Sequence, residues 1–521
     1  MNSWRFTVNR IDRSNVAIPV TGEVGAMVIR SPLGPIAPTL IQVGDEARIL
    51  RLFGTPSVTY PDIFEAVQFN KQAAIYISAP YMTTDRYGGI LVTNLGAQTL
   101  GIGNGLTDSQ IASYTFPSPN DYFLVLPLAP CVDYLAVTVS VNLQTQVFTM
   151  NLYQSPDGGV TYNFVNTYVF SMTLGTKDGF GKSMYVTDIF SGNDYIQVLP
   201  NLSANVNPTS SFVQSIQINF SGGIRNTSAL TITQFSLGWA YFQQARKYAA
   251  DIFMDTTADP GMPSVFENLS DAYQQYSSYI LPFPMGTSAS SAPLLKTSYS
   301  INDPNFAWYW NRLKVIDIYH NSSFWTSGIG LVGFKYAQMV DVFNGLPPAY
   351  IDENKHGGQL SQGLVLDIEY DPSETDLKNL DAAGINPITF DNTNGAMIQG
   401  DKSGQTPTLI SDYSYIPHVR LFNYIIQNIL SQVFTFQAFK LNDTSHRNLV
   451  RTKTQAITNP ILSVNLLSGA KVVCDTTNNT SAVLAARQFI LSVAVQVTPF
   501  SETLTLNFIN TSQGTTVDVV L

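Results

Sequence analysis

The chain has 521 residues, a formal net charge of −10, and charged side chains at only 12% of its positions. This length allows several domains with sizeable apolar cores. So few charges fit a subunit whose surface is largely covered by neighbours. The acidic balance argues against a general nucleic-acid-binding surface, which should be basic, and we expect no nucleic-acid partner.

Cysteine usage and the termini indicate where the protein resides. Cys131 and Cys474 are far apart and lack CxxC spacing, which predicts free, buried thiols in a reducing compartment. No apolar run follows the arginines near the N-terminus, so we expect no signal peptide. The uncharged stretch 134–156 alternates apolar and polar residues, which is typical of a strand and not of a membrane-spanning helix. We therefore expect a cytosolic protein without membrane contact.

The first core segment, residues 18–85, has the pattern of a mixed α/β fold. The expected elements are strands at 23–29, 39–43 and 74–78 and helices at 45–53 and 61–72. Asp45 is suited to cap the first helix, Gly54 to end it, and Pro61 to begin the second. Residues 86–119 read as a connecting segment.

The segment 120–243 is predicted to be an inserted, outward-facing antiparallel β-sandwich. Short runs of period 2 are separated by Gly- and Asn-rich turns, which is typical of that architecture. The expected strands are 123–126, 135–141, 146–153, 163–170, 195–199, 213–220 and 229–237.

Helical patterns return after the sandwich. A middle α/β domain at 244–374 should hold strands at 248–254 and 279–283, a helix at 265–276, a Gly-rich strand from 329 followed by a helix at 337–342, and an acidic loop at 346–374. A C-terminal domain at 375–509 should hold helices at 374–383, 417–433 and 445–467, the last kinked at Pro460. Strands at 489–497 and 504–508 should form a hairpin there. The fold class is thus a multidomain α/β and α+β protein.

Both termini read as strands on flexible tethers, within arms at 1–17 and 510–521. An unpaired apolar strand needs an acceptor, so we predict that each arm pairs with a different neighbouring copy at the hairpin 489–508. The residues predicted to take part in this strand exchange are Trp4, Phe6, Val8, Val493, Val495, Leu504, Leu506, Phe508, Val517, Val519 and Leu521.

Motifs for chemistry are weak. The glycine-rich segment 101–105 lacks a third glycine at the offset that a dinucleotide-binding loop requires, so a hairpin turn is favoured. No GxSxG elbow supports a nucleophile. His356 lies among acidic residues that could bind a divalent cation, although a solvated loop is favoured. We expect no catalytic residue, cofactor or metal.

The basic residues Lys440, Arg447, Arg451 and Lys453 are either a solvated face or a docking surface.

A series of motifs in order along the chain resembles one known family. They are RSPLGP at 30–35 with the strand and helix that follow, the segment 328–349, GINPI at 384–388, GDKS at 400–403, HVRL at 418–421 and the segment 468–479. The chain resembles contractile tail sheath proteins of long-tailed bacteriophages and the related sheaths of bacterial contractile injection systems. The sandwich lies outside the resemblance. Gln399, Lys402 and Ser403 differ from the family's usual Trp, Arg and Thr.

The resemblance implies a structural subunit and not an enzyme. It implies six-fold rings that stack around a tail tube and contract to drive the tube through the host envelope. The implied partners are copies of the chain, the tube protein, and baseplate and neck proteins. The implied location is the virion, after assembly in host cytoplasm. In such sheaths the inner domain faces the tube, where the basic cluster would meet acidic groups.

The alternative function is a receptor- or carbohydrate-binding protein built on the β-sandwich. Trp239, Tyr241 and nearby tyrosines would then supply aromatic platforms for a sugar.

Overall fold

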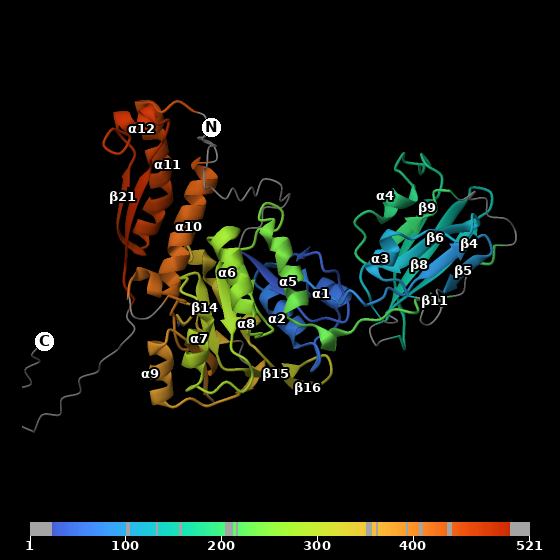
Figure 1. Ribbon diagram of the computed structural model, residues 1–521, viewed down its shortest axis with the longest axis horizontal. Helices are drawn as coiled ribbons and strands as arrows, with labels where there is room; N and C mark the ends of the chain where they lie inside the picture. The colour runs from blue at the N-terminus through green and yellow to red at the C-terminus, as the bar shows by residue number, and fades with distance from the viewer. Residues whose placement is uncertain are drawn as a thin grey trace, which may run out of the picture. The chain divides into compact units, whose positions relative to one another are not determined.

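The computed structural model (Figure 1) describes residues 23–99, 105–131, 134–155, 159–203, 212–214, 217–350, 357–360, 363–391, 394–405, 410–434 and 440–500. The chain divides into two compact units, Met1–Ser431 and Gln432–Leu521. Among the described residues no helix is both long enough and apolar enough to cross a membrane.

A nine-stranded mixed sheet forms the centre of the first unit. Its order is β17-β20-β19-β14-β13-β12-β1-β3-β2, and the six strands from β19 to β3 run parallel. The strands are β1 Val24–Val28, β2 Thr39–Ile41, β3 Ala74–Ser78, β12 Ile252–Met254, β13 Ser278–Pro282, β14 Phe306–Trp310, β17 Gln359–Leu360, β19 Asn386–Asp391 and β20 Gly395–Ile398. Parallel strands need crossover connections, and this explains the alternation of strands and helices along the chain.

Helices cover both faces of this sheet because its strands are apolar on both sides. One face packs against α1 Glu46–Phe53, α2 Pro61–Asn70 and α8 Ile329–Gln338, together with a small sheet of β15 Leu313–Asp317, β16 Ser322–Thr326 and β18 Val365–Ile368. The other packs against α5 Ile232–Ala240, α6 Met262–Ala272, α7 Ala292–Tyr299 and α9 Glu374–Ala382. On this second face the rings of Phe253, Tyr279 and Phe306 stack across three strands.

The sequence signals at the start of the core are confirmed. Asp45 accepts a hydrogen bond from the Arg48 backbone N–H at the start of α1, and Gly54 ends this helix with φ 93°. Pro61 occupies the first turn of α2. Such local signals depend on residues within one turn of each other, so they can be recognised without the tertiary structure.

Two predicted strands are instead helices. Most of the predicted strand 229–237 belongs to α5, which begins at Ile232 after a capping box formed by Thr231 and Gln234. The Gly-rich run after Gly328 is α8, whose N-terminus is held by the buried Glu65 carboxylate. That carboxylate accepts hydrogen bonds from the Gly328 and Gly330 backbone N–H groups at 2.6 Å and from the hydroxyls of Thr326 and Ser327.

The small residues in α8 serve close helix packing. A Cβ at Gly330 would lie 2.1 Å from the backbone oxygen of Glu65 in α2. Glycine at this position therefore lets α8 approach α2 and reach the Glu65 carboxylate. Burial raises the pKa of Glu65. The contact links sequence positions more than 260 residues apart.

The β-sandwich is confirmed as a fold, with altered limits. Its two antiparallel four-stranded sheets have the orders β10-β6-β4-β5 and β11-β7-β8-β9 and share one apolar core. The strands are β4 Ile90–Thr93, β5 Gly96–Thr99, β6 Asp121–Pro127, β7 Leu135–Asn142, β8 Val147–Gln154, β9 Asn163–Ser171, β10 Ile196–Pro200 and β11 Ile218–Asn219. The short helices α3 Asp108–Ala112 and α4 Val186–Phe190 accompany them. The segment 86–119 thus contributes two strands in place of a plain connection.

Arg225 fastens the insertion at its base. Its buried guanidinium donates to the backbone oxygens of Gly34, Ala79 and Pro80 in the core and of Pro130 in the insertion, at 3.0–3.2 Å. The entering and leaving segments also pair as an antiparallel bridge at positions 86 and 224. The segments that enter and leave the insertion are therefore held together by both backbone and side-chain hydrogen bonds.

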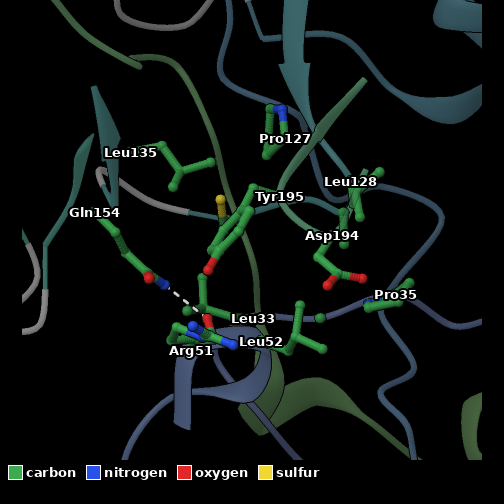
Figure 2. Close-up of a pocket in the computed structure, with 13 residues that line it drawn as sticks. Leu33, Pro35, Arg51, Leu52, Pro127, Leu128, Leu135, Gln154, Asp194 and Tyr195 are labelled. Atoms are coloured by element: carbon green, nitrogen blue, oxygen red, sulfur yellow. Dashed lines mark hydrogen bonds between the residues drawn. The ribbon is translucent and has the colours of Figure 1, made fainter. Parts of the chain in front are cut away.

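Figure 2 shows a small cavity lined by residues of both the core and the insertion. Its volume is about 40 Å³, which is room for very few water molecules. The Gln154 side-chain amide donates to the Arg51 backbone oxygen at 2.6 Å across it, as the dashed line marks. We interpret the cavity as a packing gap and not as a ligand site.

The second unit is smaller. It contains α11 Thr444–Ser463, β21 Leu467–Val473, α12 Ser481–Ala485 and β22 Ser492–Val497. The helix α10, Ile416–Gln432, leads into it from the first unit. Pro460 lies inside α11, as predicted.

The packing of α8 on α2 gives a first testable prediction. Gly330→Ala should lower the free energy of unfolding by about 3 kcal/mol, because the new methyl group overpacks a backbone contact. Gly179→Ala is the matched control, since a Cβ there has no neighbour within 4 Å. Urea unfolding of both variants measures the difference, and equal midpoints would contradict the described helix contact.

Candidate assembly interface

The sheet of the second unit consists of two described strands. β21 and β22 pair antiparallel, with Val493 opposite Val472 and Val495 opposite Ala470. Within residues 440–500 neither strand has a second strand partner at its outer edge. An isolated two-stranded sheet is marginally stable, and its free backbone groups can template another strand. This sheet is therefore the best candidate for accepting strands from other chains.

Side chains alternate along β22. Val493 and Val495 are half-buried, whereas Ser492, Ala494 and Gln496 are exposed. The sheet thus has an apolar face, and α11 packs on β21. The two valines predicted to take part in exchange therefore belong to the structured part of the acceptor.

The partner strand in the structure differs from the expected one. The structure pairs β22 with β21, a strand that the sequence did not predict. The proposed hairpin partner 504–508 lies outside the described residues. So do both arms, and with them the predicted exchange positions Trp4, Phe6, Val8, Leu504, Leu506, Phe508, Val517, Val519 and Leu521.

The basic cluster does not form one surface. Arg447 is buried, and its guanidinium donates to the Asn442 backbone and side-chain oxygens at 2.8 and 3.0 Å and to the Thr444 hydroxyl at 3.2 Å. These bonds stabilise the start of α11, and a tube-facing role for Arg447 stays a prediction. Lys440 and Lys453 are exposed and Arg451 is half-buried.

Helix geometry separates the remaining charges on α11. Successive residues are about 100° apart around a helix, so Arg451 and Lys453 point about 160° apart. They flank the buried stripe of Val450, Thr454 and Thr458 on opposite sides. Sequence proximity suggested a patch that the helix does not make.

Two asparagines that the sequence analysis gave no role shape this unit. The Asn479 side chain, 1% exposed, accepts from the Ile490 N–H at 2.9 Å and donates to the Ile490 backbone oxygen at 2.8 Å. The Asn478 amide donates to the Val473 backbone oxygen. Together they hold the connection between β21 and β22. The adjacent asparagine pair was the available signal, because such residues often satisfy loop backbone groups.

The GINPI and GDKS motifs meet in the first unit. Asn386 accepts from the Lys402 N–H at 2.7 Å and donates to the backbone oxygens of Lys402 and Trp308. The Ser403 hydroxyl donates to the Tyr413 backbone oxygen at 2.6 Å. The Lys402 ammonium lies 4.5 Å from the Tyr415 ring centroid. These motifs have a structural role, and the departures Lys402 and Ser403 retain contacts of their own.

The position where doubly wound sheets often bind ligands is occupied by the chain's own carboxylates. The strand order reverses between β1 and β12, and ligands commonly bind at the carboxyl ends of such strands. Here Asp62 accepts from the Arg30 N–H, and Asp255 accepts from the Thr257 and Ala258 N–H groups. Burial raises the pKa of Asp255 to about 7. Both carboxylates serve the local backbone, an arrangement that fits a structural role.

The aromatic residues proposed for sugar binding lie elsewhere. Trp239 is 1% exposed, belongs to α5 and contacts Phe266 in the core of the α/β sheet. Tyr241 follows that helix. Neither residue lies on the sandwich, so this support for carbohydrate binding is lost.

Comparison with known proteins agrees with the motif order. Residues 410–510 match the family model of the phage tail sheath C-terminal domain. The tail sheath protein of Enterobacteria phage T4 is 24% identical over 382 residues, which cover 68% of this chain and 55% of that protein. The chain thus spans about half the length of this curated relative.

Solved structures share the fold. A sheath tail protein from Listeria innocua aligns with a TM-score of 0.55 and 9% identity, covering 91% of this chain and 95% of that one. The helical sheath of the anti-feeding prophage in its contracted state aligns with a TM-score of 0.50 and 12% identity, covering 95% of each chain. The mixed α/β fold class is confirmed.

The chain is a homologue of phage tail sheath proteins, and residues 440–500 of its second unit lie within the segment 410–510 that matches the C-terminal domain. The two-stranded sheet, α11 and the asparagine loop are therefore features of a sheath domain.

The contrast between two arginines on one helix can be tested. Arg447→Met should lower the thermal midpoint of the second unit by several degrees, because buried oxygens lose a charged donor at a cost of about 2 kcal/mol. Arg451→Met removes the same charge from a half-buried position, where the guanidinium donates to the Asn448 side-chain oxygen at 3.1 Å, and should change the midpoint little. Differential scanning calorimetry compares them. A larger effect at Arg451 would reverse the assignment.

Proposed function

We propose that the chain is a structural subunit of a contractile phage tail sheath, and not an enzyme. It polymerises as stacked helical rings around a tail tube, and contraction drives the tube through the host envelope. The single observation that carries the proposal is the sheet β21–β22, which has no third strand among the described residues and lies inside the segment that matches the sheath C-terminal domain. A contact repeated between copies without closure generates an open helix.

Strand exchange would supply the missing strands. The arm at 3–9 of one copy and the arm at 516–521 of another would add to the β21–β22 sheet of a third by backbone hydrogen bonds. Val493 and Val495 would then be covered in the assembled sheath, together with the predicted arm residues. Main-chain bonds of this kind tolerate changes in tilt, so the linked bodies can rotate between two packings. The energy would come from surface buried between subunits and not from a nucleotide.

Charge distribution supports the second unit as the tube-facing part. Residues 432–521 hold six of the chain's 27 basic and four of its 37 acidic residues, which gives this unit a net charge of +2. The preceding residues carry −12. A basic inner domain on an acidic subunit suits an acidic tube surface and sets register while still allowing release. The remaining partners, baseplate and neck proteins, and an outward-facing sandwich follow from the same assignment, as does location in the virion.

Arm deletions test the exchange. Deleting residues 2–10 or 515–521 should abolish long sheaths, because each removes a strand that completes the sheet of a neighbour. Negative-stain electron microscopy of purified protein measures polymer length, and circular dichroism confirms that the subunits remain folded. Long contractile sheaths from either truncation would refute strand exchange.

Charge reversal tests the tube contact. The double variant Lys440→Glu, Lys453→Glu should weaken co-assembly with the tube at low salt, while sheaths still form alone, because opposite charges then become like charges. Lys182→Glu is the control, because it reverses one charge at an exposed position of the sandwich. Co-sedimentation at two salt concentrations gives the readout. Equal tube binding by the double variant and the unaltered chain would remove this surface from the proposal.

A further inference from the structure

Glu23 and Val24, at the start of β1, are bound by residues of two other segments of the first unit. Glu23 directly follows the 22 residues that contain the predicted N-terminal exchange strand, and Val24 begins β1. The Val24 N–H donates to the Asp251 carboxylate at 3.0 Å, and the Asp251 N–H donates to the Val24 backbone oxygen at 2.8 Å. Both backbone groups of Val24 are therefore bound by the start of the neighbouring strand.

Arg420 holds the same point from helix α10. One of its terminal nitrogens, Nη2, lies 3.1 and 3.0 Å from the two carboxylate oxygens of Glu23. The same nitrogen lies 2.8 Å from the Tyr336 backbone oxygen and 3.3 Å from the Asn344 side-chain oxygen. The guanidinium carbon is 4.7 Å from the centroid of the Tyr336 ring. The side chains of Arg420 and Glu23 are 3% and 11% exposed, so this ion pair is largely removed from water.

The helix that carries Arg420 connects the two units in sequence. α10 runs from Ile416 to Gln432, where the second unit begins. Asn423 and Gln427 on the same helix donate to Asn305 at 2.8 Å and to the Tyr276 backbone oxygen at 2.9 Å. α10 is thus fixed to the first unit along its length before the chain continues into the strand-accepting sheet.

We propose that Arg420 and Glu23 are positioning residues for strand exchange: their buried ion pair fixes the root of the N-terminal arm to the helix that leads into the acceptor unit. The arm then leaves the first unit beside the helix that continues, along the chain, into the acceptor unit. The ion pair would share, with the bonds between Val24 and Asp251, any force that an exchanged arm puts on the start of β1. The inference rests on the proposed sheath function, which supplies the exchange.

The physics of a buried ion pair explains why this anchor is firm. Removing one partner leaves the other charge buried without compensation, so the pair resists separation more strongly than an exposed one. Arg420 also keeps its place through Tyr336 and Asn344, and the Glu23 carboxylate therefore meets a preorganised site. A force on the arm would have to break the contact between Glu23 and Arg420 before β1 could shift.

The test uses Glu23→Gln, which keeps the shape of the side chain and removes its charge. We expect the protein concentration needed for sheath formation to rise about tenfold, which corresponds to ~1.4 kcal/mol per contact. The thermal midpoint of the isolated subunit should change by only a few degrees, because the bonds of Val24 to Asp251 and the pairing of β1 with its two neighbouring strands remain. Pelleting assays and electron microscopy measure assembly. Amide hydrogen exchange of residues 24–28 in assembled sheaths should increase.

Asp194→Asn is the matched control. It removes the carboxylate from a second arginine–carboxylate pair among the described residues of the first unit, Arg48–Asp194 at 2.8 Å, which is more exposed and remote from the arm in sequence. Assembly should be unchanged in this variant. Arg420→Lys, which keeps the charge but loses the planar guanidinium, is the second variant, and its assembly should fall in the same direction as that of Glu23→Gln.

The results separate the anchor from the exchange itself. If sheaths lacking residues 2–10 assemble normally, the exchange in the proposed function fails, whatever the Glu23 variant does. If that truncation abolishes assembly while Glu23→Gln assembles and exchanges amides like the unaltered chain, the anchor alone is refuted. A loss of assembly matched by a proportional loss of subunit stability would also refute it, because the pair would then act on folding and not on the arm.

Discussion

Backbone N–H and C=O groups along a strand edge need partners, and the two units of this chain satisfy that constraint differently. In the first unit the parallel strands find partners within the chain, and antiparallel strands close both sides of the run. In the second unit the described strands have only each other. A sheet of two strands with one helix packed on it is only marginally stable by itself. The second unit is therefore where other copies of the chain can contribute to the structure.

The first unit has the extensive internal packing that the proposed strand exchange would need. Its sheet is packed on both faces, and its helices are fixed by contacts between distant parts of the chain, such as Glu65 at the start of α8. The strand order has a reversal at which other folds bind ligands, but here Asp62 and Asp255 bond to the local backbone. A fold often used for catalysis thus serves as a structural body, which accords with function residing in sites and not in folds.

The β-sandwich adds a second apolar core without breaking the first. Its entering and leaving segments pair with each other, and Arg225 binds carbonyl oxygens on both sides of the junction. An insertion between β3 and β12 is tolerated because these strands lie on either side of β1 and each pairs with it. The core therefore does not depend on the length of the connection.

The sequence alone determined the features that depend on near neighbours in the chain. These are the caps of α1, the proline that begins α2, the alternating strands of the sandwich, and the order of motifs that points to a sheath protein. Periodicity and capping need only a few consecutive residues, so they are visible before folding.

Only the tertiary structure decided the features that join distant residues. The run after Gly328 is a helix because Glu65 binds its N-terminus, although a Gly-rich apolar run is equally compatible with a strand. Arg447 is buried because it lies on the stripe of α11 that includes Val450, and this helix packs on β21, although its neighbours in sequence suggested an exposed cluster. The pairing of Glu23 with Arg420 spans almost 400 positions. Burial and pairing depend on which segments meet, and no local pattern carries that information.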